Sequence, residues 1–521
     1  MRITLTLLIA SATALAQTPQ ANPDPAKRFF ASRPVVNVAI TLASEDRQSL
    51  RDRPREYVPA TISINGDRKG WPGVGIKLKG AAGSFREIDD GPGFTVNLGK
   101  FGGAERLHGL KRFHLNNGRQ DDSRLCEWLG CEVFTAAGYP APRVAHAIVT
   151  LDDELLGLYV LREGFDRQFL QRILGSTEGT LYDGGFCNDI DKSLERDSGD
   201  GPRDHSDLAR LRDACALMND GRTAKLESAI DINRFIDFMV LEAMVGHWDG
   251  YCQNRNNFRL WCSAKLGGSL FFPHGMDQLF GKAHASVLQH PSAIVASAVN
   301  QHPVWRKRYR TRLNQLLPYL KSRSLNKKLK AQGARMAKAL KRHDSDRARE
   351  LTKDVRDLMN RVSARYKSLQ KQVREPEPRA LTFRKGKPHK LDDWNPSGET
   401  DQIELKKKGA AFLIQCKSRG EEERRGAYRT TVLLARGKYR LAATVRSDDL
   451  EALARGAGGV RLMAGDKAGR ALLGDNKWTQ LSCDFEVSKM QENVELRLEL
   501  RGRDGKAWFR ISSLQLAPAA P

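Results

Sequence analysis

Hydrophobic and polar residues alternate in short runs along the first third of the chain. Alternation with a period of two is typical of half-buried strands. One stretch has a helical period instead: Asp121 and Ser123 offer capping oxygens, and Leu125, Leu129 and Val133 follow on one face. The pattern predicts a sheet interrupted by one helix. The expected strands are 35–40, 60–64, 74–79, 94–98, 112–115, 144–151 and 156–161.

Beyond residue 165 the hydrophobic spacing becomes helical. Residues 230–247 form an apolar segment, and the basic stretch 304–374 carries a single apolar stripe that recurs every three or four residues. Between Arg306 and Arg374 there are 23 Lys and Arg against 5 Asp and Glu, so this stretch holds most of the net charge of +24. Two interpretations stay open for it: a solvated helix face, or a surface for an anionic polymer or acidic protein.

The last quarter of the chain returns to strands. Residues 375–382 contain two prolines and are interpreted as a linker. From 383 to 521 short strands alternate with turns and no helix is expected, which is typical of a β-sandwich of jelly-roll type. The expected strands include 411–415, 430–434, 439–445, 459–463, 494–500 and 508–511.

The composition and the first residues indicate a folded, exported protein. The chain has 521 residues, of which 40% are hydrophobic and 28% charged, and this excludes a disordered or fibrous chain. Arg2, an apolar stretch and a small-x-small site predict a signal peptide cleaved after Ala16, followed by a loose leader at 17–32. The mature protein is expected to be secreted or periplasmic, without a membrane span. Export permits disulfides, and a bridge between Cys416 and Cys483 is one option.

The most specific chemistry lies between Gly246 and Phe258. Asp249 and Asn254 have the spacing of a kinase catalytic loop, where the Asp acts on the attacking hydroxyl and the Asn holds a metal ion. Asp277 comes just after a later strand, where a kinase places its second metal ligand. Two carboxylates and an amide on adjacent loops suit Mg²⁺. We therefore expect these side chains to converge in one cleft between a mostly β lobe and a mostly helical lobe.

These motifs resemble the CotH family of secreted and spore-coat proteins, atypical kinases with a divergent protein-kinase-like fold. The resemblance covers about residues 35–375. It implies phosphorylation of protein Ser/Thr, with ATP and Mg²⁺ or Mn²⁺ as cofactors. The stretches that carry it are 74–80 (VGIKLKG) with 83–84, 157–163 (GLYVLRE), 179–182 (GTLY), 248–258 and 274–280 (HGMDQLF).

The resemblance implies roles for single residues. Asp249 would be the catalytic Asp and Asp277 a metal-binding Asp. Asn254 has the ordinary kinase spacing, but Asn257 fits the family's Asn-aromatic pattern, so both are carried as metal candidates. Glu163 lies in the hinge-like stretch and would contact nucleotide, with a strand-end salt bridge as its other interpretation.

The sequence departs from the family pattern before residue 94. Many members have a basic residue there, whereas this chain reads Gly-Pro-Gly-Phe at 91–94. The phosphate-binding cation would then be Lys79, Lys77, Lys100 or none. Glu127 or Glu132 on the predicted helix would pair with that lysine, or remain a surface carboxylate.

Other polar groups have more than one interpretation. The acidic run from Asp183 to Asp207 is a solvated loop or a substrate-recognition loop. His247 and His274 are expected to hold the catalytic loops rather than to transfer protons. Aromatic residues of the last domain are core residues or sugar-stacking platforms, because that domain weakly resembles carbohydrate-binding modules. They are Trp394, Tyr428, Trp478 and Trp508.

The predicted fold class is α+β, a two-lobed kinase-like domain at 33–374 followed by a β-sandwich. The mostly β lobe is 33–165 and the mostly helical lobe is 166–374. The expected partners are a protein substrate and a surface polysaccharide or acidic partner. Three alternatives remain: a non-catalytic scaffold, a glycan hydrolase with paired carboxylates, and nucleic-acid binding through the basic helices, which no recognised motif supports.

Overall fold

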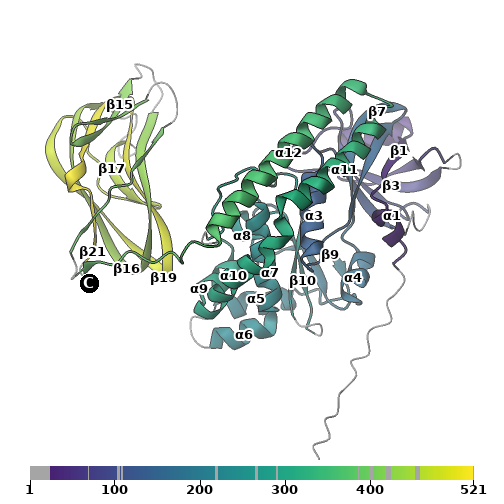
Figure 1. Ribbon diagram of the computed structural model, residues 1–521, viewed down its shortest axis with the longest axis horizontal. Coiled ribbons are helices and arrows are strands. Elements are labelled where there is room, and N and C mark those ends of the chain that lie inside the picture. Colours follow the sequence, from purple (N-terminus) through teal and green to yellow (C-terminus); the bar gives the residue numbers. More distant parts are fainter. Residues whose placement is uncertain are drawn as a thin grey trace, which may run out of the picture. The chain divides into compact units, whose positions relative to one another are not determined.

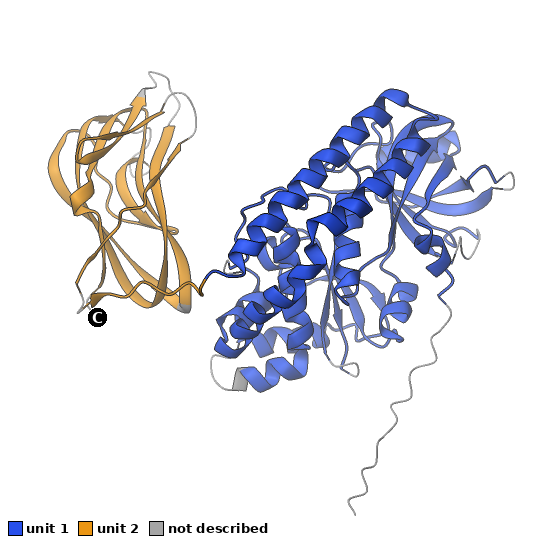
Figure 2. Cartoon of the chain, in the orientation of Figure 1, with its two compact units in different colours: residues 1–375 blue, residues 376–521 orange. Residues whose placement is uncertain are grey.

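The computed structural model describes residues 24–519, except 68–69, 103–105, 107–108, 217–220, 265–267, 289–290, 385–386, 399–402, 418–423 and 452–457. The signal peptide expected at 1–16, and most of the leader, lie outside these residues. The chain divides into two compact units, 1–375 and 376–521 (Figure 2). The hydrophobic cores of unit 1 contain no residue of unit 2, and the reverse also holds.

Unit 1 begins with a short helix and a closed barrel. The strand order is β1-β2-β3-β4-β5-β7-β6, and β1 closes the barrel by pairing parallel with β6. All seven strands expected from the sequence are present, with ends within three residues of those predicted. The elements are α1 (Lys27–Ala31), β1 (Val35–Thr41), α2 (Ser44–Asp52), β2 (Val58–Ile64), β3 (Trp71–Lys79), β4 (Gly93–Asn97), β5 (Arg112–Asn116), α3 (Cys126–Ala136), β6 (Val144–Leu151) and β7 (Glu154–Glu163).

The expectation of a single helix within this sheet is wrong. The expected helix is α3, whose residues are almost all buried. A second helix, α2, connects β1 to β2. It buries only Leu50, so its sequence has no apolar stripe from which a helical period could be recognised.

The rest of unit 1 is mostly helical, around a four-stranded sheet of order β11-β10-β8-β9. The long helices α11 and α12 lie side by side (Figure 1), and a Cβ on Gly333 of α11 would come within 2.9 Å of Val355 of α12. The elements are α4 (Arg167–Leu174), β8 (Thr180–Asp183), β9 (Glu195–Gly199), α5 (Ser206–Ala216), α6 (Gly221–Ala229), α7 (Ile232–Val245), α8 (Tyr251–Asn254), β10 (Phe258–Cys262), β11 (Leu270–Pro273), α9 (Ile294–Gln301), α10 (Pro303–Leu316), η1 (Leu317–Leu320), α11 (Ser322–Leu340) and α12 (Ser345–Gln372).

The described part of unit 2 is built mainly from strands, and a short 3-10 helix, η3 (Ile511–Ser513), precedes the last of them. Its main sheet has the order β14-β15-β20-β16-β19-β17-β18. The strands are β12 (His389–Lys390), β13 (Asn395–Gly398), β14 (Ile403–Lys408), β15 (Ala411–Lys417), β16 (Arg424–Glu451), β17 (Gly459–Ala464), β18 (Lys467–Ala468), β19 (Asn476–Gly502), β20 (Asp504–Arg510) and β21 (Gln515–Pro518).

The expectation of uniformly short strands in unit 2 is wrong. The segments expected at 430–434 and 439–445 both belong to the long strand β16, which pairs along its length with β19. The register shifts between Ala435 and Gly437, so the chain continues through a bulge where a turn was expected. A bulge and a turn both favour glycine, so the sequence pattern does not distinguish one from the other.

All eight cysteines are free thiols, so the optional bridge between Cys416 and Cys483 is not formed. Cys416 lies in β15 and Cys483 in β19, and β20 and β16 separate these strands in the sheet. In the described part of the chain, no helix is long and apolar enough to cross a membrane. The structure therefore combines α and β elements in unit 1 with an all-strand framework in unit 2.

Candidate active site

The loop after α7 surrounds Asp249 with amide donors. Helix α7 ends at Gly246, which has a left-handed backbone, and the short helix α8 follows. Asn254 Nδ2 donates to Asp249 Oδ1, and Asn256 and Asn257 donate to Asp249 Oδ2 at 3.0 and 2.7 Å. Asn254 and Asn257, the two predicted metal candidates, are thus both brought to the predicted catalytic Asp. The third contact, from Asn256, was not predicted.

Two buried groups hold this loop in place. The Glu242 carboxylate accepts hydrogen bonds from the backbone amides of Tyr251 and Cys252 at 3.1 and 3.0 Å, and burial raises its pKa to about 7. His247 Nε2 donates to the carbonyl of His274 at 2.9 Å. Burial lowers the pKa of His247 to about 4, so the imidazole is neutral. His247 therefore fixes the loop, as expected.

Asp277 lies at the edge of a cavity of about 560 Å³, which His247 and Trp248 also line. Among the described residues, its carboxylate accepts a hydrogen bond only from its own backbone amide. Burial, together with the negative charges of Glu127 and Asp121, raises the pKa of Asp277 to about 7. A carboxylate that is costly to ionise and forms no ion pair among the described residues fits a cation ligand.

The Asp249 and Asp277 loops adjoin each other through Asn257. The backbone amide of His274 donates to the carbonyl of Asn257 at 3.1 Å. A Cβ on Gly275 would lie 2.3 Å from Asn257 Oδ1, and the φ of Gly275 is +54°. Only glycine fits this close approach and this backbone. The Asn257 side chain therefore touches both loops.

Lys79, at the end of β3, reaches the same region. Its Nζ donates to Asn116 Oδ1 at 2.5 Å, and Asn116 Nδ2 donates to Glu127 Oε2 at 2.7 Å. Burial and the neighbouring Arg162 lower the pKa of Lys79 to about 8, while Glu127 and Asp277 oppose this. Of the two helix glutamates, Glu127 is thus linked to the lysine. Glu132 pairs instead with Arg33 and Lys328.

The other predicted cations lie elsewhere on the barrel. Lys77 and Lys100 both approach the ring of Tyr57, at 4.9 and 5.5 Å from its centroid. Neither makes an ion pair among the described residues. Lys79 is therefore the candidate lysine that interacts with both Glu127 and Asp277.

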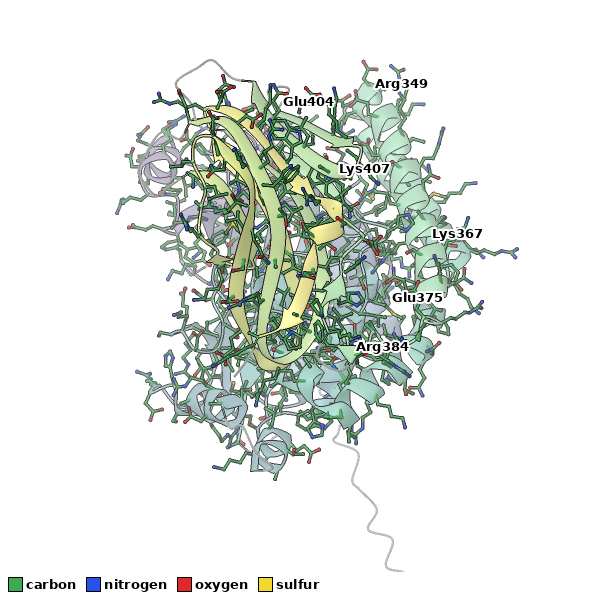
Figure 3. The ribbon with its side chains drawn as sticks, turned by 90° about the vertical axis from the view of Figure 1, so that its left-hand side faces the viewer. Arg349, Lys367, Glu375, Arg384, Glu404 and Lys407 are labelled. Atoms are coloured by element: carbon green, nitrogen blue, oxygen red, sulfur yellow. The ribbon has the colours of Figure 1, made fainter. Side chains whose placement is uncertain are left out.

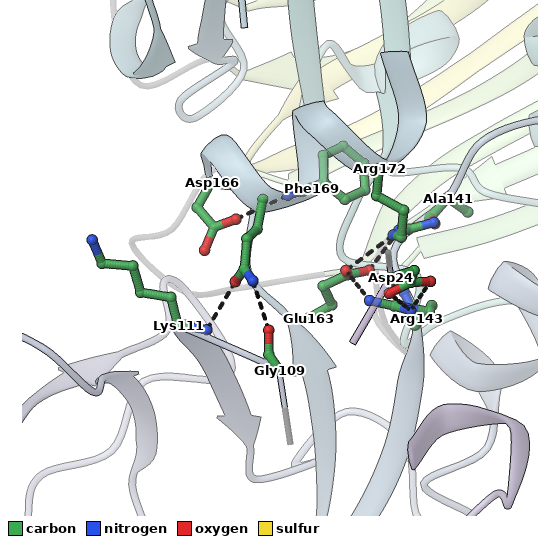
Figure 4. A network of polar contacts seen from close by, with 10 residues as sticks. Asp24, Gly109, Lys111, Ala141, Arg143, Glu163, Asp166, Phe169 and Arg172 are labelled. Atoms are coloured by element: carbon green, nitrogen blue, oxygen red, sulfur yellow. Dashed lines mark hydrogen bonds and ion pairs between the residues drawn. The ribbon is translucent and has the colours of Figure 1, made fainter. Parts of the chain in front are cut away.

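Glu163 takes part in an ion-pair network. Figure 4 shows its carboxylate between Arg143 and Arg172, with ion pairs of 2.8 and 2.6 Å. It also accepts a hydrogen bond from the backbone amide of Arg143 at 3.0 Å. Asp24 binds the other side of the Arg143 guanidinium. These contacts correspond to the strand-end salt bridge, and they do not join Glu163 to the Asp249 and Asp277 loops.

Helix α12 holds the chain that follows Asp277, which the sequence did not indicate. The fully buried Arg365 donates to the carbonyls of Ala243 and Met244 at the end of α7, and to those of Ala283 and Ala285. One turn earlier, Arg361 donates to the carbonyl of Leu279 at 3.0 Å. Eight of the 28 residues of this helix are Arg or Lys, and nothing in the sequence separated these two from their solvated neighbours.

Most of the acidic run at 183–207 is fixed by specific partners, so its interpretation as a solvated or substrate-recognition loop is wrong for these residues. Arg259 pairs with Asp183 and Asp197 at 2.6 and 3.4 Å. Asp207 accepts from Tyr182, and Asp189 from Tyr251 and the amide of Ile294. Asp191, Glu195, Asp200 and Asp204 remain exposed, as expected of a solvated loop.

The model of the family described as CotH kinase protein matches residues 93–374. The chain belongs to this family. The matched range contains Asp249, Asn254, Asn257 and Asp277, whereas Lys79 lies before it. No curated protein matches the chain.

Three solved structures can be aligned with about a quarter of the CotH-family chain, at low identity and low TM-score. The CBM22-1–GH10 modules of Clostridium thermocellum xylanase 10B are 9% identical with a TM-score of 0.18, and the overlap covers 24% of this chain and 26% of that chain. TmCBM61 in complex with β-1,4-galactotriose is 14% identical with a TM-score of 0.17, over 25% and 91% of the two chains. A family 29 carbohydrate-binding module mutant with mannohexaose is 10% identical with a TM-score of 0.17, over 25% and 85%.

Proposed function

We propose that unit 1 is an atypical kinase that transfers the γ-phosphoryl group of ATP to a Ser or Thr hydroxyl of a protein. In this proposal the barrel and the helical part are the two lobes of a kinase-like fold. The protein is exported, and unit 2 is a jelly-roll-type module that binds a surface polysaccharide or protein. Family membership supports the kinase-like character, and the arrangement around Asp249 and Asp277 supports the residue roles.

The transfer forms one P–O bond and breaks another. The acceptor hydroxyl oxygen attacks the γ-phosphorus, and the bond from that phosphorus to the bridging oxygen breaks to release ADP. Asp249 orients the hydroxyl and takes its proton, while three asparagine amides fix the direction of its carboxylate. Lys79 offsets the charge of the phosphates from the barrel side.

The donor set fits Mg²⁺ or Mn²⁺ held largely by substrate oxygens. No group of three or more His, Cys, Asp or Glu side chains that could hold a metal occurs among the described residues. Asp277 with an amide oxygen of Asn257 or Asn254 would hold such an ion, since Mg²⁺ is commonly bound through one or two carboxylates plus phosphates and water. The ion would neutralise charge on the phosphate oxygens.

One observation carries the proposal: Asp277 lines the same cavity as His247 and Trp248, which directly precede Asp249, within a CotH-family domain. The test is incubation of the full chain with γ-labelled ATP, Mn²⁺ and a generic protein acceptor. We expect label on Ser or Thr in the wild type and none with Asp277→Ala. Equal labelling in the two proteins would contradict the proposal.

A non-catalytic scaffold is the second candidate function. Both oxygens of Asp249 already accept amide hydrogen bonds, so the carboxylate is engaged with the protein before an acceptor hydroxyl binds. If the wild type binds no nucleotide with Mg²⁺ or Mn²⁺ at millimolar concentration, the scaffold is the better description.

The surface of unit 2 limits which aromatic residues would stack on a sugar. Trp394 and Tyr428 are buried in the core and are excluded as platforms. Trp478 is 40% exposed, and the guanidinium of Arg510 lies over its ring at 4.6 Å. Trp508 is half-buried with Arg446 over its ring at 4.8 Å. We propose Trp478 as the main contact to a polymer.

A further inference from the structure

A row of polar side chains crosses the barrel. Lys77, Thr95, His114 and Arg162 stand in register on the neighbouring strands β3, β4, β5 and β7, so they project from one face. We call these four residues the polar row. Thr95 Oγ1 and His114 Nδ1 are 3.1 Å apart within it. Arg162 Nη2 lies 3.4 Å from His274 Nε2, which joins the row to the loop of Asp277.

Arg162 has too few acceptors for a buried guanidinium. Its side chain is 1% exposed, and it forms an ion pair with Glu127 at 3.3 Å. That ion pair is made by Nε. Within the part of the chain that the structure describes, Arg162 Nη1 has no hydrogen-bond acceptor, and His274 Nδ1 has no hydrogen-bond partner. Buried donors without acceptors are costly and rare in native proteins. The natural partner for the missing contacts is an anion, because the planar fork of a guanidinium matches phosphate oxygens.

Three nitrogen-bearing side chains, those of His114, His274 and Lys79, surround Arg162. The pKa values of His114 and His274 lie well below the ordinary value. Burial is the main cause, and the positive charge of Arg162 is the second. Lys79 lies nearby, and burial lowers its pKa as well. Lys79, His114 and His274 are only partly buried, so Arg162 lies beneath residues that border solvent. With these lowered pKa values the two imidazoles are neutral, and an anion bound here would be attracted by the charges of Arg162 and Lys79.

We propose that Arg162 binds a phosphate oxygen of the phosphoryl donor, alongside Lys79; this rests on the proposed function. Its Nη1 is the donor, and the ion pair between its Nε and Glu127 Oε1 orients the guanidinium. The ligand is a molecule with a di- or triphosphate group, and Arg162 contributes specificity for that group. Arg162 does not take part in proton transfer.

The test uses the full chain and inorganic pyrophosphate with Mg²⁺, measured by titration calorimetry. We expect Arg162→Met to weaken pyrophosphate binding about tenfold or more, since it removes charge-assisted hydrogen bonds. Arg162→Lys should recover part of the affinity as a point charge. The matched control is Arg172→Met, which likewise removes an arginine from a buried glutamate, Glu163, and should leave the affinity unchanged.

The outcomes separate this proposal from the proposed function. If Arg162→Met is folded by circular dichroism and binds pyrophosphate as the wild type does, or if the wild type binds no pyrophosphate, Arg162 is not an anion ligand. If Arg162→Met does not fold, the double variant with Glu127→Gln removes the unpaired carboxylate and answers the same question. If binding depends on Arg162 but no variant or wild type transfers phosphate from ATP, the anion site stands and the kinase proposal fails.

Discussion

At the level of single residues, Asp249 and Asp277 differ in the groups around them. Asp249 is held by three amides, whereas Asp277 accepts only from its own amide among the described residues. We expect Asp277→Asn to abolish metal-dependent nucleotide binding, because it removes the charge that attracts the cation. Asp249→Asn should leave nucleotide binding nearly intact and lower turnover by roughly 10²–10⁴-fold, the range for a general base. Calorimetry and single-turnover labelling measure the two steps, and loss of the same step in both variants would contradict the assignment.

The ionisation of Glu242, which holds the catalytic loop, makes the stability of the folded protein depend on pH. Burial raises its pKa from 4.5 to about 7 in the folded protein. The neutral form is therefore favoured by folding, and this stabilisation is complete below pH 4.5 and is lost as the pH rises through 7. The loss amounts to about 3 kcal/mol at 1.36 kcal/mol per pKa unit.

Glu242→Gln should remove this part of the pH dependence. The measurement is urea unfolding of unit 1 within the full chain at pH 5 and pH 8. We expect the free energy of unfolding to fall more steeply with pH in the wild type than in the variant. Glu56→Gln is the control, because Glu56 is exposed in a surface ion pair. If the free energy of unfolding changed equally with pH in the wild type and in Glu242→Gln, ionisation of Glu242 would not destabilise the folded protein, and the prediction would be wrong.

At the level of elements, α12 positions the metal loop as well as covering the core. Its outer side carries exposed residues such as Arg349 and Lys367 (Figure 3), while Arg365 on the inner side donates to four carbonyls. Lysine cannot reach all four, and each buried carbonyl left without a donor costs about 1–3 kcal/mol. We expect Arg365→Lys to destabilise unit 1 by about 3 kcal/mol and to speed hydrogen exchange at Phe280 and Val287. Arg349→Lys, on the exposed side, should change neither, and unchanged exchange in Arg365→Lys would contradict the positioning role.

The elements also separate what the sequence could predict from what it could not. Strands β1, β2 and β5 were predicted because buried and less buried residues alternate along them, β6 because it is a nearly continuous buried run, and α3 because its apolar residues repeat with a helical period. Helix α2 was missed because it buries only Leu50. The Asp249 loop was predicted from local spacing. The contacts of Arg365 with the end of α7 and of Arg162 with His274 join segments more than 100 residues apart, and local patterns carry no information about such pairs.

At the level of the whole molecule, the two units should unfold separately. The core residues of unit 1 end at Val373 and those of unit 2 begin at Leu391, so no single core spans the boundary at Pro376. Linkers between such units carry few contacts, and each unit is large enough to fold alone. We expect the full chain to show two thermal transitions by calorimetry. Fragments 17–375 and 376–521 should each be soluble and should each reproduce one of these transitions within a few degrees. A single cooperative transition of the full chain, together with aggregation of both fragments, would mean that the units depend on each other for stability. In that case unit 2 would be a structural part of the enzyme rather than an appended binding module.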